Sequence, residues 1–117
     1  MLHLSPAVRY YLYTGDTDMR KGFDSLCGMV SSQMQLDALS GAVFVFINKK
    51  RNQVKMLLWE GDGLSLYYKR LEQGTYERPA DIGDTSSTTL TYQQLQFILQ
   101  GVNLKKIELR RRYQKTA

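Results

Sequence analysis

The sequence contains few of the residues on which disulfide-bonded proteins and many enzymes depend. It has one cysteine, one histidine and two prolines among 117 residues. A single cysteine excludes a disulfide within the chain and is typical of a reducing compartment. The chain also lacks the run of ~20 apolar residues that a membrane-spanning helix needs, and its start lacks the pattern of a signal peptide. We therefore expect one cytoplasmic domain without membrane contact.

The same scarcity argues against the common kinds of active site. His3 is the only histidine, so a Ser-His-Asp or Cys-His arrangement would depend on one residue near a chain end. Cys27 falls on the apolar stripe of an expected helix, where core packing is the simpler role. No cluster has zinc spacing, and no glycine-rich run ends in Lys-Ser or Lys-Thr. Most carboxylates stand where turns and helix caps favour them, so we predict no catalytic residues, no metal and no cofactor.

Positive charge is concentrated toward the C-terminal end. Residues 105–117 hold six basic side chains and one glutamate, a net charge of +5. The whole chain has the same net charge of +5. The other 104 residues carry ten basic and ten acidic side chains and are neutral. Such a cluster favours contact with a polyanion, most simply nucleic acid; a solvated tail that aids solubility is the alternative. We assign residues 1–104 to a single domain and residues 105–117 to a basic C-terminal tail.

Hydrophobic patterning predicts several strands. A β-branched and aromatic run over 41–48 has apolar residues at both parities, which indicates a strand covered on both faces. Further strands are expected over 10–15, 54–60 and 64–71, with a short one over 74–79 that ends at Pro79. Residues 80–90 are small, polar and unpatterned, and we interpret them as a loop.

Two amphipathic helices accompany the strands. Apolar residues at spacings of three and four predict a helix over 19–34, with Asp18 as its N-cap. Thr91 and Gln94 have capping-box spacing and begin a second helix, which Gly101 is placed to end. The predicted fold is therefore α+β, with a small antiparallel sheet of three to five strands packed by two helices.

The segment Glu60-Gly61-Asp62-Gly63 lies between two of the expected strands. Asp-Gly between alternating strands is a strong hairpin signal, whereas a calcium loop needs further oxygen ligands that the following residues lack. With a three-residue loop, one face of the hairpin holds Val54, Met56, Leu58, Leu66 and Tyr68, and the other holds Lys55, Leu57, Trp59, Ser65, Tyr67 and Lys69. The second face can stack on bases and meet phosphates. Packing of its aromatic rings in the core, with the lysines reaching out to water, is the favoured interpretation.

Arg20 and Lys21 are candidate phosphate contacts near the start of the first expected helix. Cations at a helix N-terminus oppose the helix dipole, and such unfavourable placement invites a functional explanation. Pairing with Asp16 or Asp24 is the alternative, and the sequence leaves both open.

Lys49, Lys50 and Arg51 are expected at a hairpin tip, a shape that can enter a groove or follow a phosphate backbone. Protection of a sheet edge by lysine is the alternative for this group. A further basic pair, Lys69 and Arg70, ends the aromatic strand of the second hairpin and is a third candidate.

The order of several motifs resembles that of one protein family. The motifs are "DMRKGFD", an "FVF" strand followed by a basic turn, "WEGDGLSLYYKRLE" and "LTYQQLQFILQG". Together they are similar to the small accessory protein of IS66-type insertion sequences over about residues 8–104. The resemblance implies a protein that is encoded beside a transposase and needed for efficient transposition. It carries over no catalytic residues, and it leads us to expect contact with DNA or with the transposase.

These observations predict a non-enzymatic accessory protein of DNA transposition that contacts the DNA ends of the element, its transposase, or both. A protein-interaction module that binds the transposase without touching DNA is the alternative. Because phosphate contacts dominate the expected binding, affinity should fall steeply with salt. The predicted nucleic-acid-binding residues are Arg20, Lys21, Lys49, Lys50, Arg51, Lys69, Arg70, Lys105, Lys106, Arg110, Arg111 and Arg112.

Overall fold

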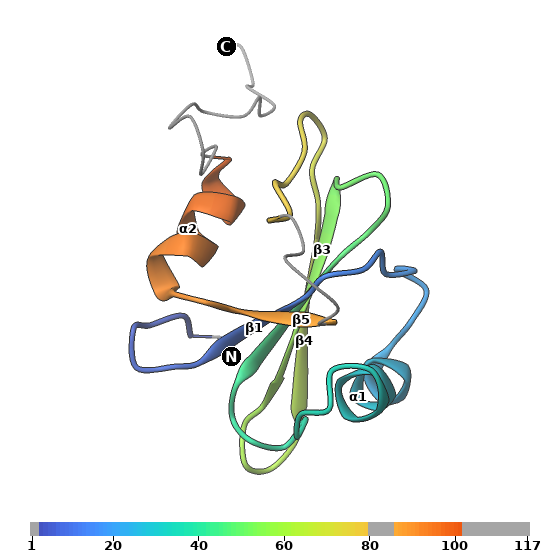
Figure 1. Cartoon of the computed structure of the whole chain (residues 1–117), viewed down its shortest axis with the longest axis vertical. Helices are drawn as coiled ribbons and strands as arrows, with labels where there is room; N and C mark the ends of the chain where they lie inside the picture. Colours follow the sequence, from blue (N-terminus) through green and yellow to red (C-terminus); the bar gives the residue numbers. More distant parts are fainter. Residues whose placement is uncertain (1–2, 80–85, 102–117) are drawn as a thin grey trace.

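A five-stranded sheet lies between two helices in the part of the chain that the structure describes (Figure 1). The structure is a computed structural model, and it describes residues 3–79 and 86–101. The elements in chain order are β1 (Tyr10–Tyr13), α1 (Phe23–Ser32), β2 (Val43–Ile47), β3 (Gln53–Trp59), β4 (Leu64–Arg70), β5 (Ser87–Leu90) and α2 (Tyr92–Gln100). The expected α+β class, a small sheet packed by helices, is confirmed.

The sheet is mixed, with one parallel pairing. Its strand order is β4-β3-β2-β1-β5, in which β2, β3 and β4 form an antiparallel meander and β5 is antiparallel to β1. β1 and β2 run parallel, with Tyr10 opposite Val43 and Leu12 opposite Val45. The expectation of antiparallel pairing was wrong here. The chain between β1 and β2 includes α1, and a crossover of this kind allows neighbouring strands to run in the same direction.

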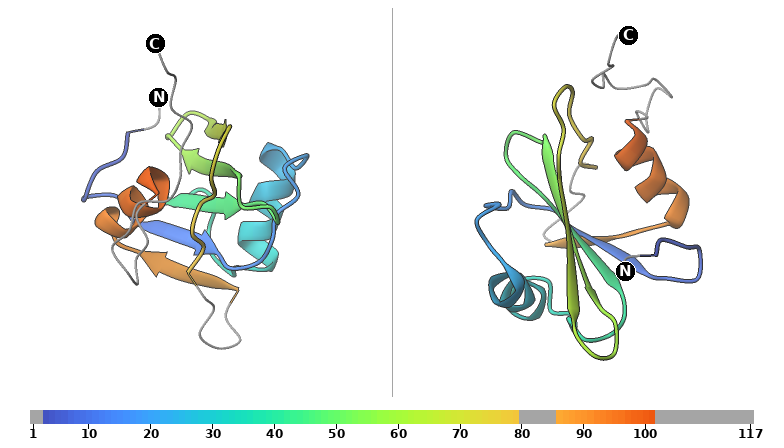
Figure 2. Two further views of the ribbon diagram at one scale, coloured as in Figure 1. Left: turned by 90° about the horizontal axis from the view of Figure 1, so that it is seen from above. Right: turned by 180° about the vertical axis from the view of Figure 1, so that it is seen from behind.

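Apolar side chains pack on both faces of the sheet. On one face, Leu95 and Ile98 of α2 join the core formed by the inward residues of β1, β2 and β3. On the other face, Leu26 and Val30 of α1 pack with Phe44 and the neighbouring side chains. Figure 2 shows the two helices on opposite sides of the sheet. Every residue of β2 is buried, so the expectation of a strand covered on both faces is confirmed.

α1 begins later than expected. Its N-cap is Gly22, in an extended conformation with φ −106° and ψ −154°, and not Asp18. The Asp18 carboxylate instead accepts the backbone N–H of Arg20 at 2.9 Å, and its carbonyl accepts the N–H of Lys21 at 3.1 Å. These bonds make a separate turn before the helix. Arg20 and Lys21 therefore do not open α1, which removes the helix-dipole argument that singled them out.

The start and end of α2 are as expected. The Thr91 hydroxyl accepts the N–H of Gln94 at 3.0 Å, and the Gln94 side chain accepts the N–H of Thr91 at 2.8 Å. This is the reciprocal capping box. Gly101 ends the helix in the left-handed conformation with φ 87°, which glycine adopts at little cost.

Two expectations between residues 71 and 90 were wrong. Residues 74–79 form no strand; Tyr76 is 1% exposed and donates its N–H to the carbonyl of Arg51 at 2.6 Å. Ser87–Leu90, within the segment interpreted as a loop, forms β5. Its small polar residues carry no strand pattern of their own, and the backbone of β1 supplies the hydrogen-bonding partners.

The β3–β4 hairpin forms as predicted, but its loop is one residue longer than the loop considered above. Trp59 lies opposite Leu64, which leaves residues 60–63 as the loop. A shift of one residue turns every β4 side chain to the opposite face of the sheet. The face that holds Lys55 therefore also holds Leu57, Trp59, Leu64, Leu66 and Tyr68.

Candidate nucleic-acid interface

Four segments that are far apart in the sequence meet at one end of the sheet. We call this region the basic end; it comprises residues 16–21, the β2–β3 turn 48–52, residues 69–72 and residues 76–78. Two backbone hydrogen bonds join the turn to the later segments, Leu71 N–H to Asn52 O at 2.7 Å and Tyr76 N–H to Arg51 O at 2.6 Å. A third, from Thr17 N–H to the carbonyl of Ile47 at 3.0 Å, ties the first segment to the last residue of β2, next to the turn. In Figure 1 the β2–β3 turn and the chain after β4 project together at the upper end of the sheet.

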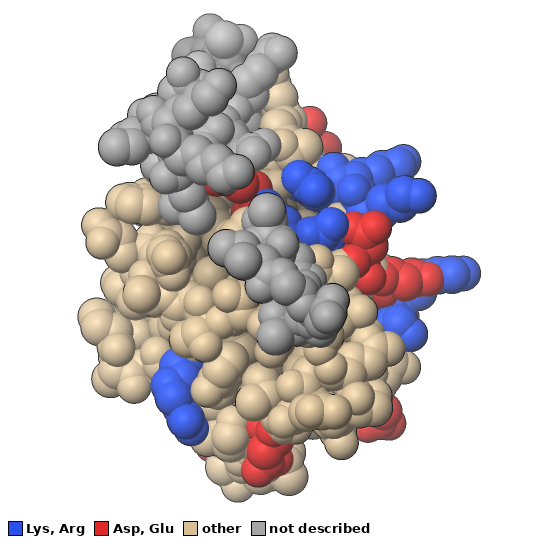
Figure 3. Space-filling model, viewed as in Figure 1, with Lys and Arg blue, Asp and Glu red and all other residues tan. Residues whose placement is uncertain are grey.

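The basic end holds most of the positive charge in the described residues. Eight of the ten lysines and arginines within 3–79 and 86–101 belong to it: Arg20, Lys21, Lys49, Lys50, Arg51, Lys69, Arg70 and Arg78. Four carboxylates share the region, those of Asp16, Asp18, Glu72 and Glu77. Figure 3 shows lysines and arginines gathered with acidic side chains between them at the upper right. The region is therefore positive overall, but part of its charge is compensated locally.

The β2–β3 turn displays three cations on a fixed backbone. Asn48, which is 8% exposed, accepts the N–H groups of Asn52 at 3.0 Å and of Gln53 at 2.9 Å with its side-chain oxygen. Its Nδ2 also donates to the side chain of Asn52 at 2.8 Å. The hairpin tip expected for Lys49, Lys50 and Arg51 is confirmed, and all three are exposed. None of the three forms an ion pair with another described residue.

Two other candidate cations are paired with acids. Arg20 forms an ion pair with Asp18 at 2.6 Å, and its Nε also donates to that carboxylate. These hydrogen bonds from Arg20 lower the pKa of Asp18 to about 2. Arg70 forms a longer pair with Glu72 at 3.1 Å. The alternative considered for Arg20 was pairing with Asp16 or Asp24. Arg20 does pair with an acid, but the partner is Asp18, which lies in the same tight turn.

Arg78 was missed in the sequence. It pairs with Asp16 at 2.6 Å and donates to the carbonyl of Gly15 at 2.9 Å, and its side chain is only 12% exposed. It therefore ties the chain after β4 to the chain after β1. No local signal marks this contact, because the two partners stand more than sixty positions apart in the sequence.

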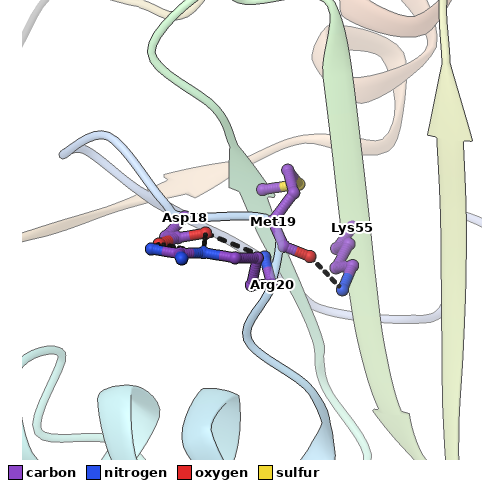
Figure 4. A network of polar contacts seen from close by, with 4 residues as sticks. All are labelled: Asp18, Met19, Arg20 and Lys55. Atoms are coloured by element: carbon purple, nitrogen blue, oxygen red, sulfur yellow. Dashed lines mark hydrogen bonds and ion pairs between the residues drawn. The ribbon is translucent and has the colours of Figure 1, made fainter.

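Lys55 organises the centre of the basic end from within β3. Although it is 6% exposed, its Nζ donates to the carbonyls of Met19 at 2.8 Å and Lys21 at 2.7 Å, as Figure 4 shows for Met19. The same ammonium lies 4.5 Å from the centre of the Tyr68 ring. A buried ammonium requires such partners. A lysine inside the apolar run "VKMLLW" was the available signal for this role.

A hollow of about 490 Å³ opens between the Arg20 turn and the β2–β3 turn. Arg20, Lys49 and Lys50 line it together with Tyr68. Tyr68 is 52% exposed, and its hydroxyl donates to the side-chain oxygen of Gln53. The structure thus brings three predicted cations and one exposed aromatic ring around a single concave surface.

The remaining predicted cations are placed differently. Lys69 lies opposite Val54, on the face of the sheet that α2 covers, and not on the face of Tyr68. Lys69 and Arg70 line a separate hollow of about 430 Å³ next to Leu99 of α2. Lys105, Lys106, Arg110, Arg111 and Arg112 fall outside the described residues, so their role and the boundary at residue 104 stay predictions.

The described residues include one cysteine, Cys27, which is partly buried. No group of three or more His, Cys, Asp or Glu side chains within them could hold a metal ion. Burial raises the pKa of the Cys27 thiol, and the charge of Asp24 raises it further, which disfavours the nucleophilic thiolate. No helix in these segments is both long enough and apolar enough to cross a bilayer.

Comparison with known proteins agrees with the motif resemblance. The uncharacterized protein y4hO of Sinorhizobium fredii is 34% identical over 103 residues, which cover 88% of each chain. The uncharacterized protein y4jC of the same organism is 32% identical over 79 residues, or 68% of each chain. No solved structure matches the chain. The model of a family described as IS66 Orf2-like protein matches residues 8–109, which is most of the sequence, and the chain therefore belongs to the IS66 Orf2-like family.

Proposed function

We propose that the protein is a non-enzymatic accessory factor of DNA transposition that binds DNA phosphates with its basic end. Membership of the IS66 Orf2-like family supports the accessory role in an insertion sequence. The DNA at the ends of the element is the proposed ligand, and the transposase of the same element is a second proposed partner. The contribution of the chain is to bind and position, with no catalytic step assigned to it.

The observation that carries the proposal is the β2–β3 turn. Lys49, Lys50 and Arg51 are exposed and have no carboxylate partner among the described residues. The hydrogen bonds of Asn48 hold the backbone that carries them. Cations that are already positioned lose less conformational entropy on binding than cations on a mobile loop. Such a turn is suited to meet several phosphates of one strand.

The salt dependence of binding gives the proposal a quantitative form. Each phosphate that a cation neutralises on duplex DNA contributes about −0.9 to the slope of log K against log salt. Three contacts from the turn give a slope of about −2.7, and further contacts make it steeper. Affinity should then fall at least about fortyfold between 50 and 200 mM salt.

A pair of charge reversals tests whether the basic end is the contact surface. Lys49→Glu should weaken binding to DNA of the element's ends by about tenfold at moderate salt and reduce the salt slope by about one. Arg9→Glu makes the same change in charge at an exposed residue outside the basic end, and it should leave affinity almost unchanged. Fluorescence anisotropy over a salt series measures both. Equal losses in the two variants would mean that only net charge matters.

The alternative of a transposase-binding module has one supporting observation. Arg20, Arg70 and Arg78 are already engaged by Asp18, Glu72 and Asp16, which lowers the charge available for DNA. Absence of a gel shift at low salt, together with co-purification of the transposase, would favour this alternative. Retention of DNA by the purified chain alone would favour phosphate binding.

A further inference from the structure

We infer that the hollow beside Tyr68 is a subsite for one unpaired nucleotide, so that the basic end prefers single-stranded over duplex DNA. In this arrangement the Tyr68 ring stacks on the base, and Lys49 and Lys50 hold the phosphate next to it. The inference rests on the proposed function, because it assumes that the basic end contacts DNA. It adds the form of DNA that the site recognises.

The Tyr68 ring is held in place before any ligand arrives. Its hydroxyl donates to the side chain of Gln53, and the Lys55 ammonium lies over the ring at 4.5 Å from its centre. Lys55 is itself fixed by the carbonyls of Met19 and Lys21. A ring with both its tip and one face engaged has little freedom to lose on binding.

The ring is also available to a ligand. Tyr68 is 52% exposed even though Lys55 approaches one of its faces. It stands in β4, which is an edge strand of the sheet, and the four-residue hairpin loop places it on the side away from α2. An aromatic ring of this exposure can be covered by a base, and stacking tolerates any base because every base has a π-face.

The hollow has the charge and the size that a nucleotide requires. Lys49 and Lys50 line it without carboxylate partners, whereas Arg20 is neutralised by Asp18 on its rim. Its volume of about 490 Å³ lies within the range of roughly 300–1,000 Å³ that is typical of small-ligand sites. Thr17 also lines the hollow, although its hydroxyl is buried and has no hydrogen-bond partner among the described residues.

The preference for an unpaired base follows from the geometry of DNA. A duplex offers its phosphates to the lysines, but its bases stay stacked inside the helix unless one is flipped out. A single strand offers a phosphate and an unstacked base together. Tyr68 can contribute only in the second case, while Lys49 and Lys50 contribute in both.

Tyr68→Leu and Tyr67→Leu are the matched variants that test the inference. The neighbouring tyrosine is also exposed but faces the opposite side of the sheet, opposite Met56. For a labelled oligonucleotide of about twelve nucleotides, Tyr68→Leu should weaken single-strand binding about tenfold and duplex binding less than about twofold. Tyr67→Leu should change neither. Tyr68→Phe, which keeps the ring and removes the hydroxyl, should retain most of the single-strand affinity.

The outcomes separate the inference from the proposed function. Equal losses for both DNA forms in Tyr68→Leu, or no loss, would overturn the nucleotide subsite while the phosphate contact through Lys49 still stands. If the wild-type chain binds neither form, both fall. Photo-crosslinking of wild-type protein to a single strand that contains iododeoxyuridine does not depend on how the variants fold. A crosslink at Tyr68 supports the subsite, and crosslinks confined to other residues overturn it.

Discussion

The two turns that flank β3 carry opposite charges. The turn over 48–52 presents Lys49, Lys50 and Arg51, and the loop over 60–63 presents Glu60 and Asp62. Asn48 closes the first turn through side-chain hydrogen bonds. The second is closed by the backbone bond from Glu60 N–H to Gly63 O at 2.9 Å, with Gly61 at φ 93°.

This contrast shows how one strand can separate positive from negative charge in a small domain. The two turns lie at opposite ends of β3, next to the pairs Ile47–Val54 and Trp59–Leu64, so the strand holds the basic and acidic ends at a fixed separation. The Ser65 hydroxyl donates to the Glu60 carboxylate and lowers its pKa, which favours the negative charge at the second turn. A polyanion is attracted to one end and repelled by the other. The predictions below test how each end is built.

The largest expected effect is that of Lys55→Met. The substitution removes the donor to the carbonyls of Met19 and Lys21, and those acceptors lie in partly buried surroundings. We expect a loss of about 3 kcal/mol in the free energy of unfolding, measured by urea denaturation. Amide exchange at residues 16–21 should accelerate, while the Glu60 N–H in the acidic loop keeps its protection. Lys50→Met, an exposed control, should change stability by less than about 0.5 kcal/mol.

Asn48→Ala should disrupt the basic turn with a smaller loss. It leaves the N–H groups of Asn52 and Gln53 without their acceptor, and we expect a destabilisation of about 2 kcal/mol. Asn52→Ala removes only the side-chain bond to Asn48 and should cost about 1 kcal/mol. Thermal unfolding distinguishes the two variants. If both variants lose the same amount, the side-chain oxygen of Asn48 is not what holds the turn.

Glycine substitutions should affect the two turns in opposite directions. Gly61 has φ 93°, a conformation that costs an L-residue about 1 kcal/mol, so Gly61→Ala should lower stability by that amount. Arg51 adopts φ 59° without being glycine, and Arg51→Gly should raise stability by up to about 1 kcal/mol. Gly63→Ala is the control, because a Cβ there meets open space. Chemical denaturation of all three variants under one condition measures these changes in the free energy of unfolding. A gain for Gly61→Ala or a loss for Arg51→Gly would contradict the prediction.

The parts of the fold that could be predicted are those with local causes. Thr91, Gln94 and Gly101 mark the ends of α2 by short-range hydrogen bonds and a backbone preference. β5 and the parallel pairing of β1 with β2 depend on partners distant in the chain. The β3–β4 register is set by the length of the loop, and a change of one residue in that length reverses the face of every β4 side chain. The sequence of the hairpin is compatible with either loop length, so the register could not be predicted.

The residues of the candidate site also differ in whether local sequence patterns could predict their placement. Lys49, Lys50 and Arg51 could be placed at a tip because the surrounding strands are strongly patterned. Arg20 pairs with Asp18 because the two residues lie in a tight turn. The sequence pattern predicted a helix there, so this pairing could not be expected. The exposure of Tyr68 could not be predicted, because the three-residue loop considered in the sequence places its ring on the face of Val54 and Met56, which are core residues. The four-residue loop of the structure places it on the face of Lys55.

The smallest expected effect concerns the exposed pair of Arg20 and Asp18. Because hydrogen bonds from Arg20 lower the pKa of Asp18 from 3.8 to about 2, the stabilisation by the pair is fully present above about pH 4. It is lost as the pH falls from there through about 2, since the unfolded chain binds the proton first. The arginine side chain is 92% exposed, so solvent and salt keep the contribution small. Arg20→Gln should return the pKa of Asp18 toward its ordinary value in an NMR titration, and an unchanged pKa would mean that Arg20 does not hold the carboxylate in solution.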